Sequence, residues 1–524
     1  MEWFNITRRG LLKGASALGL TAGVAAAMAP RFSLAQDGKV LRVRAYSDIQ
    51  IIDPAFTLAA PEGDVMRCIF SKLVEYPAGE TWGWKKNAAA EIEQVDPTHV
   101  KFTLRPGIMF TNGFGEMTAE DVKYSYERIA DPATESPYKD DFAVLDHVEV
   151  TDTYSGVIVL KEPFAPLWTS SLPNGSGCIL SKKAMESVGG KFETEPPATA
   201  GPYKIKQWLP KQKLILERDP DWNGEPGGFE TIEILPIEDE KTAEIAFEAG
   251  ELDFTVVSVG SIPQYETSPP PGAALIRRPS LAYVWLGMNV DAEPFTDPKV
   301  RRAVQHAIDV GATVEAAYMG VAERSTGIIA PGLPGHREKT LYQDEPDLEK
   351  ARALLAEAGY PDGFSCTLDI LNKTERLTAA QIIQANLAEI GIQVEIQQRD
   401  SGTFWTLGME SEGDQWKNVQ LLLSRFSMAP DPSWATAWFT PEQVGVWNWE
   451  RFNNAEFGEL HKKALVETDT AKRDAMYQRM QDLMEESGAY VFLTHEATGV
   501  IYSTAIVPAL QPDATVILPE FRPA

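Results

Sequence analysis

Cysteine is scarce in this sequence: the 524 residues include three, Cys68, Cys178 and Cys366. No two of them have the C-x-x-C spacing of a zinc knuckle or a redox motif. Because the number is odd, at least one thiol stays unpaired. We expect buried thiols, although one disulfide could form in an oxidising compartment. The sequence therefore predicts neither a cysteine-held metal nor cysteine redox chemistry.

The common signatures of catalytic sites are missing as well. There is no H-E-x-x-H zinc-protease motif, no G-x-S-x-G nucleophile elbow and no complete phosphate-binding loop. The six histidines are scattered, and the 75 carboxylates are too numerous for any one pair to indicate an acid–base site. We predict that the protein is not an enzyme and carries no cofactor or metal; a periplasmic hydrolase is the least favoured alternative.

Long apolar runs and positive charge are also in short supply. Beyond the N-terminal region no run of eighteen apolar residues occurs, so we expect no membrane-spanning helix. The chain has 48 Lys and Arg against 75 Asp and Glu, a formal net charge of −27. Such a surface keeps a protein soluble and repels nucleic-acid phosphates, so we predict no nucleic-acid partner.

The first 35 residues have the order of an export signal. A twin-arginine pattern at 7–13 is followed by a weakly apolar stretch at 14–29 and by small residues at 33–35. This order predicts a secretory signal, and the paired arginines favour the twin-arginine export machinery. The alternative is a chance basic cluster ahead of a buried helix. No Cys follows the cleavage site, so we expect a soluble periplasmic protein without a lipid anchor.

Strand patterns and capped helices alternate along the rest of the chain. Residues 40–45 alternate apolar and polar side chains, as a half-buried strand does. Thr118 with Asp121 predicts a capping box, and Asp297-Pro298 predicts another helix start. The chain is also longer than one compact core usually holds. These features predict an α/β fold with two or more lobes.

Five groups of motifs resemble, in order, the family 5 extracellular solute-binding proteins, which are the oligopeptide, dipeptide and nickel receptors of ABC importers. They cover nearly the whole chain after the export signal. They are F-T-L-R-P-G-I-M-F at 102–110 with 118–128, A-G-P-Y at 200–203 with R-D-P-D-W at 218–222, 295–304 with 307–309, 350–360 and 472–478. Most of these motifs set turns, caps and packing rather than ligand contacts.

This resemblance implies a two-lobed fold of the periplasmic binding protein type II class with an extra inserted subdomain. Lobe I would hold 36–280 plus 489–524, with the insert at about 56–195, and lobe II would hold 281–488. Two chain crossings would form a hinge. Closure on the ligand would be the signal read by an importer of two permeases and two cytoplasmic ATPases.

The resemblance also points to a ligand site. In peptide receptors of this family an Asp holds the ligand amine, three residues before an acidic residue and a Pro. Here that pair is Asp431-Pro432, so the matching residue is Met428, whose thioether cannot pair with an ammonium. Arg425 stands where oligopeptide receptors carry Trp. Its guanidinium could bind a ligand carboxylate or phosphate through two hydrogen bonds, or it could pair with an acidic residue of the protein itself. A small gap in the match to the family would instead make Asp431 the residue that holds the ligand amine.

Other candidates are aromatic or acidic. Trp405, Trp447 and Trp449 belong to a cluster of aromatic residues, of which we expect two or three in the cleft and the rest in the core. Asp48 matches an acidic cleft residue of the family, or it caps a turn. The favoured ligand is a peptide or peptide-like solute such as an amino-acid conjugate. The alternative is an acidic sugar or sugar conjugate. The resemblance also leaves a nickel or haem receptor open, although the sequence has no metal-ligand spacing.

Overall fold

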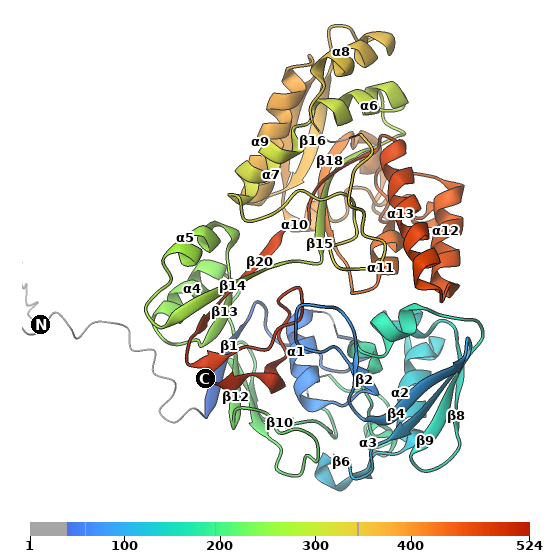
Figure 1. Cartoon of the computed structure of the whole chain (residues 1–524), viewed down its shortest axis with the longest axis vertical. Helices are drawn as coiled ribbons and strands as arrows, with labels where there is room; N and C mark the ends of the chain where they lie inside the picture. Colours follow the sequence, from blue (N-terminus) through green and yellow to red (C-terminus); the bar gives the residue numbers. More distant parts are fainter. Residues whose placement is uncertain (1–38, 58, 194, 343–344) are drawn as a thin grey trace, which may run out of the picture.

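The computed structural model describes residues 39–57, 59–193, 195–342 and 345–524. The chain folds into two main parts, one above the other in Figure 1, which two neighbouring segments connect. We call the part built on the sheet that contains β1 lobe I, and the part built on the sheet that contains β15 lobe II. The predicted export signal at 1–35 lies outside the described residues.

Lobe I is built on a seven-stranded mixed sheet. In spatial order its strands are β10 (Tyr203–Leu209), β11 (Lys213–Arg218), β12 (Thr231–Pro236), β1 (Val40–Ala45), β13 (Phe254–Val257), β20 (Ala497–Ser503) and β14 (Ala273–Pro279). Leu41 and Val43 of β1 face the core, which confirms the strand predicted from the alternation at 40–45. Three helices contact this sheet: α1 (Ala60–Ile69), α4 (Glu240–Glu248) and α5 (Ile262–Thr267).

The chain between α1 and β10, residues 70–202, forms an insert with its own sheet. That antiparallel sheet has the order β4 (Ala89–Asp96), β5 (His99–Leu104), β9 (Ser155–Leu160) and β8 (Leu145–Val150). Helix α2 (Ala119–Ala130) packs on β8. Helix α3 (Lys182–Ser187), further along the chain, contacts α2. The predicted capping box starts α2, because the Asp121 carboxylate accepts a hydrogen bond from the Thr118 amide at 2.8 Å.

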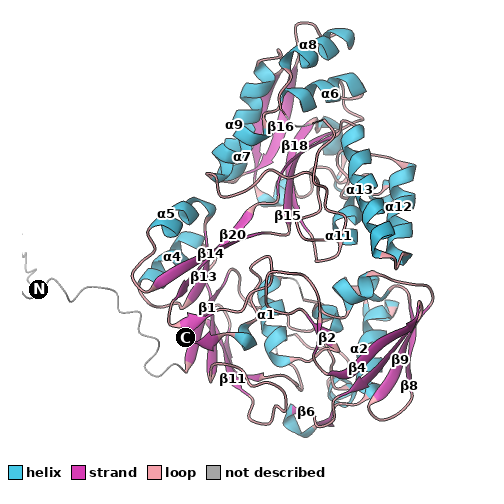
Figure 2. Cartoon of the chain, in the orientation of Figure 1, coloured by secondary structure: helices cyan, strands magenta, loops and turns pink. Residues whose placement is uncertain are grey.

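Lobe II has a five-stranded mixed sheet between layers of helices (Figure 2). Its strands, in spatial order, are β17 (Gln393–Arg399), β16 (Ser365–Leu371), β18 (Leu421–Ser427), β15 (Ala282–Met288) and β19 (Tyr490–Thr494). Its main helices are α6 (Pro298–Ala307), α7 (Val310–Tyr318), α8 (Leu348–Glu357), α9 (Thr374–Ala388), α11 (Pro432–Thr436), α12 (Ala455–Val466) and α13 (Thr470–Glu486). The predicted cap at Asp297 begins α6.

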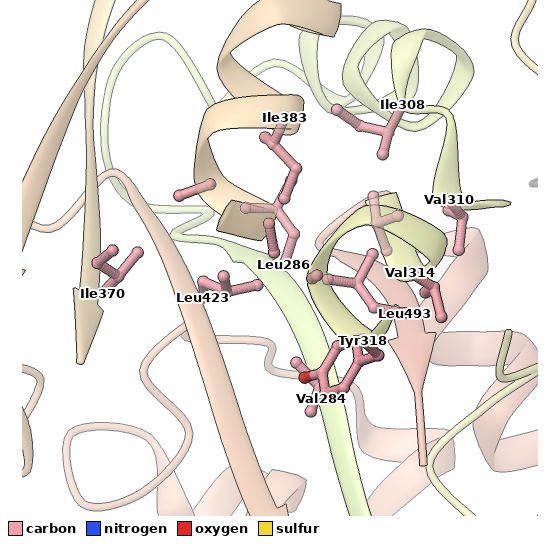
Figure 3. Packing of buried hydrophobic residues seen from close by; sticks show 14 of the residues in the cluster. Val284, Leu286, Ile308, Val310, Val314, Tyr318, Ile370, Ile383, Leu423 and Leu493 are labelled. Atoms are coloured by element: carbon pink, nitrogen blue, oxygen red, sulfur yellow. The ribbon is translucent and has the colours of Figure 1, made fainter. Parts of the chain in front are cut away.

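The largest apolar core lies between the lobe II sheet and its helices. Figure 3 shows Leu286 and Leu423 of the sheet near Ile383 of α9 and Val314 of α7. The same cluster continues into Phe247 and other residues of α4 and α5, so the two lobes share apolar packing beside the crossings. Burial of this surface removes water from one side of the interlobe junction.

Two segments cross between the lobes. One is Ser280-Leu281, between β14 and β15, and the other is His495-Glu496, between β19 and β20. The Ser280 hydroxyl donates to the His495 carbonyl at 2.7 Å, so the crossings run side by side. The boundary expected at 489 falls too early. Residues 490–494 pair with β15 because this fully buried strand packs against the lobe II cores.

The predicted α/β fold with two lobes is confirmed. Cys68, Cys178 and Cys366 are all free and buried, so the disulfide that the sequence left open is not formed. In the part of the chain that the structure describes, no helix is both long and apolar enough to span a membrane.

Candidate functional site

The candidate site is a cleft between the lobes. It consists of two adjoining cavities of about 420 and 490 Å³ that share lining residues from both lobes, among them Ala60 and Asp513 of lobe I and Met428 of lobe II. Leu281 of the first crossing lines both cavities as well. The cleft therefore lies beside the first crossing and is lined by both lobes.

Helix α1 supplies charged groups to the lobe I wall. Pro61 begins the helix, while Val65 and Ile69 are buried in the lobe I core. Asp64 and Arg67, one turn apart on the remaining face, form an ion pair at 2.8 Å. Asp64 lines the smaller cavity and Arg67 lines the larger one. Each side chain keeps a fifth to a quarter of its surface exposed, at 20% and 25%. The pair thus offers both signs of charge to the cleft.

The Asp64 carboxyl titrates far above its ordinary range. Burial raises its pKa to about 7, and the nearby Asp513 adds to the rise, while Arg67 opposes it. Asp513 itself accepts hydrogen bonds from the amide and hydroxyl of Thr515, at 3.0 and 2.9 Å. Two neighbouring carboxylates favour a cation between them, because it relieves their mutual repulsion. This end of the cleft suits an ammonium group.

Strand β18 supplies the opposite wall. Met428 is buried but lines both cavities, and Arg425 lines the smaller one. The Arg425 Nε donates to Glu496 at 2.8 Å, and the other Glu496 oxygen accepts from the Nη2 of Arg376 at 2.6 Å. Burial of Glu496 opposes its ionisation, but Arg376 and Arg425 outweigh it and lower its pKa to about 2. Internal pairing and cleft exposure therefore coexist at Arg425, which is 44% exposed.

Asp431 does not face the cleft. Its carboxylate accepts two hydrogen bonds from the Nη2 of Arg473, at 2.8 and 2.9 Å, and one from the Thr169 hydroxyl at 2.5 Å. It also caps α11 through the Ser433 amide. The side chain has no exposed surface, and the Arg473 charge overcomes burial to lower its pKa. In this conformation Asp431 is not accessible to a ligand amine.

The remaining candidates lie outside the two cavities. Asp48 accepts a hydrogen bond from the Lys211 amide at 3.0 Å and so fixes the β10–β11 hairpin. Trp449 is buried in a small core that Trp405 and Trp447 pack against. Trp447 stacks on Trp449 with ring centroids 6.2 Å apart. Of the predicted site residues, the structure brings Arg425 and Met428 to the cleft.

The insert closes one side of the cleft against lobe II. The Trp434 indole donates to the Ser170 hydroxyl at 2.9 Å, and the Ala165 amide donates to the Leu465 carbonyl at 2.8 Å. With the Thr169 bond to Asp431, these contacts hold the lobes together away from the hinge. The structure is therefore a conformation in which the lobes approach each other on both sides.

Sequence reasoning missed the lobe I wall. Asp64, Arg67 and Asp513 belong to no motif singled out from the sequence. A signal was present: two opposite charges three residues apart on a helix whose other faces are apolar. That pattern is common on solvated helices, so it does not by itself indicate a binding site.

Comparison with known proteins defines the family. The sequence profile of the middle region of the bacterial extracellular solute-binding proteins, family 5, matches residues 84–445. The chain belongs to this family. The resemblance inferred from the motifs, and with it the predicted role as a solute-binding receptor, is thereby confirmed.

One curated protein and two solved structures illustrate what this chain is similar to. The glutathione-binding protein GsiB of Escherichia coli K12 is 27% identical over 423 residues, which cover 78% of this chain and 80% of that protein. The periplasmic binding protein DppA of Helicobacter pylori, solved with the peptide STSA, aligns with a TM-score of 0.75 and 24% identity over 92% of this chain and 98% of its own. AgaA of A. tumefaciens R10, solved with agropinic acid, aligns with a TM-score of 0.73 and 22% identity over 93% and 99%.

Proposed function

We propose that this protein is a periplasmic receptor that captures a small zwitterionic peptide or amino-acid conjugate and delivers it to an ABC importer. The observation that carries this proposal is the lining of the cleft. Carboxylates of Asp64 and Asp513 share the smaller cavity with the Arg425 guanidinium. A peptide carries an ammonium and a carboxylate on one short molecule, so it complements both groups at once.

The roles of the charged residues follow from their surroundings. The ligand ammonium binds between Asp64 and Asp513, and its charge promotes ionisation of Asp64. The ligand carboxylate binds the Nη groups of Arg425, since its Nε is already held by Glu496. Met428 supplies apolar contact between them. Relatives named for glutathione and for a bound peptide support this class of ligand.

The wider setting of the receptor is part of the same proposal. The twin-arginine pattern at 7–13 directs export, and the mature protein works in the periplasm. Lobe I holds the insert and the C-terminal tail, lobe II holds the segment between the crossings, and the lobes hinge at 280–281 and 495–496. Two permeases with two cytoplasmic ATPases receive the closed form. We expect the receptor to act without catalysis and without a bound metal.

A second candidate ligand is an acidic sugar conjugate. Arg425 favours it, because a guanidinium binds a carboxylate whatever molecule carries it. AgaA, which has the same fold, was solved with agropinic acid, and this supports an acid as a second class of ligand. A non-peptide acid without an ammonium would leave the cleft carboxylates of Asp64 and Asp513 without a ligand cation, so we place it second.

The first test is native mass spectrometry of the protein purified from its own periplasm, with release and fragmentation of the bound solute. Residue-mass ladders support the peptide, and a single mass with a hexose supports the alternative. Titration calorimetry with the released solute then compares Arg425→Ala with Arg399→Ala. Arg399 is a matched control, because its Nε also pairs with a carboxylate, Asp369 at 2.7 Å, but outside the cleft.

We expect Arg425→Ala to weaken binding at least about tenfold, the value of one charge-assisted contact, with an unchanged melting profile. Arg399→Ala should leave the affinity as it is. Equal affinity of the two variants would remove Arg425 from the site.

A further inference from the structure

A large groove in lobe I adjoins the larger of the two cleft cavities. It has a volume of about 860 Å³ and lies between the insert and the C-terminal segment. It is lined by the end of α1, by β2 (Val74–Glu75) and β3 (Lys85–Lys86), and by residues 511–522. Four of its residues also line the larger cleft cavity: Arg67, Lys72, Tyr76 and Gln511. The groove and the cleft are therefore contiguous.

The charge of this groove is opposite to that of the protein. Among the described residues that line it, six are cations and three are carboxylates. The whole chain has 48 Lys and Arg against 75 Asp and Glu. The cations are Arg67, Lys72, Lys85, Lys86, Arg105 and Arg522. On so acidic a chain, such an excess of cations around one groove creates a local positive potential.

Most of these cations have no carboxylate partner. Among the residues that the structure describes, the Lys86 ammonium donates to the Ala90 carbonyl at 2.6 Å and Arg105 to a carbonyl at 2.8 Å. Arg522 and Lys72 likewise bond only to carbonyl oxygens. Carbonyls satisfy the donors without supplying a full negative charge. Lys85 and Arg67 differ, since Lys85 pairs with Glu75 and Glu520, and Arg67 pairs with Asp64.

A buried donor without a partner lies where the groove meets the cleft. Gln511 is 3% exposed, and its Nε2 is buried with no hydrogen-bond partner. Its backbone is fixed, because its amide donates to the Thr515 carbonyl at 2.8 Å and its own carbonyl accepts from Arg278 at 2.7 Å. A buried amide donor is normally satisfied, so its presence here indicates an acceptor supplied by a ligand.

We propose that this lobe I groove binds an anionic group, a carboxylate or a phosphate, carried by the solute whose zwitterionic part occupies the cleft. The inference rests on the proposed function and narrows it to acidic peptides and acidic conjugates. The anion enters past Arg67, accepts a hydrogen bond from the Gln511 amide and is neutralised by Lys86, Arg105 and Arg522. Arg67 then contacts both parts of the same ligand.

Calorimetry with three probes, trialanine, triglutamate and trilysine, tests the proposal. Triglutamate should bind the natural protein about tenfold more tightly than trialanine, and trilysine least tightly. Lys86→Glu should remove the advantage of triglutamate while leaving trialanine binding unchanged. Lys101→Glu is the matched control: it makes the same charge change on an exposed strand of the insert, outside this groove, and should alter neither affinity.

A second variant separates binding from folding. Gln511→Leu removes the unpaired amide, so it should raise the melting temperature of the protein. It should still weaken the binding of triglutamate several-fold. A residue with only a structural role would not move these two quantities in opposite directions. Equal affinity for triglutamate and trialanine, or equal effects of Lys86→Glu and Lys101→Glu, would overturn the groove proposal while peptide binding stands.

Two further outcomes would also overturn it. In the first, inorganic phosphate binds to the natural protein but not to Lys86→Glu, and it does not compete with triglutamate. The groove would then bind a free anion rather than part of the solute. If none of the three peptides binds, the proposed peptide function fails together with the groove proposal.

Discussion

Replacement of Asp431 by alanine should destabilise lobe II rather than weaken ligand binding. The Asp431 carboxylate has no exposed surface and accepts two hydrogen bonds from Arg473, whose side chain is 8% exposed. The Thr169 hydroxyl of the insert makes a further bond to it at 2.5 Å. Without the carboxylate, the guanidinium remains buried with no counter-charge.

The size of the effect follows from that unpaired charge. Breaking a buried ion pair by removing one partner typically costs about 3–5 kcal/mol. For a folding unit of about 150–250 residues, each kcal/mol lowers the melting temperature by roughly 2–4 °C. Asp431→Ala should therefore lower the lobe II transition by roughly 6–20 °C. Asp48→Ala is the control: it loses one bond to a backbone amide, so its transition should move by only a few degrees.

Differential scanning calorimetry measures the transitions, and a double variant checks the cause. Asp431→Ala combined with Arg473→Met leaves no charge unpaired, so it should be more stable than Asp431→Ala alone. The reasoning is refuted if Asp431→Ala melts like the natural protein and instead loses peptide affinity. That result would make Asp431 the amine anchor, as in the peptide receptors of the family.

Three further predictions concern the interior of lobe II and the hinge. Burial raises the pKa of Glu450 from 4.5 to about 7, so its ionisation lowers stability as pH rises through that range, by roughly 3 kcal/mol. In urea unfolding at several pH values, Glu450→Gln should lack this loss; an unchanged pH profile would contradict the assignment. Gly287→Ala would place its Cβ 2.1 Å from the Glu450 Oε1 and should destabilise by about 1–3 kcal/mol in thermal unfolding. Glu496→Gln should cost about 3–5 kcal/mol, because Arg376 is buried, and should strengthen binding of triglutamate by releasing Arg425, as calorimetry can check.

Local features of the fold could be predicted from the sequence because nearby residues determine them. The alternation at 40–45 gives β1, and Thr118 with Asp121 gives the start of α2. The C-terminal boundary of lobe II was placed too early, because β19 joins its sheet by pairing with β15, some two hundred residues earlier in the chain. No local pattern distinguishes a strand that precedes a crossing from one that follows it.

The candidate site depends more strongly on distant contacts. Arg425 and Met428 could be identified because their spacing from Asp431-Pro432 is local. The role of Asp431 could not, since its partners Arg473 and Thr169 lie 42 and 262 residues away. The lobe I wall was missed for the same reason: Asp64 and Asp513 come from opposite ends of the chain and meet only in the folded cleft.

The connection between cleft and hinge depends on one carboxylate. Glu496 lies on the second crossing, with a φ of 57° that non-glycine residues rarely adopt. One of its oxygens is held by Arg376 of α9 and the other by Arg425 at the cleft wall. In the proposed binding mode, a ligand carboxylate on Arg425 competes with Glu496 for the same positive charge, so occupancy of the cleft would alter the forces on the crossing. A ligand can shift the balance of open and closed forms only by its differential affinity for them, and this shared guanidinium is where such a difference arises.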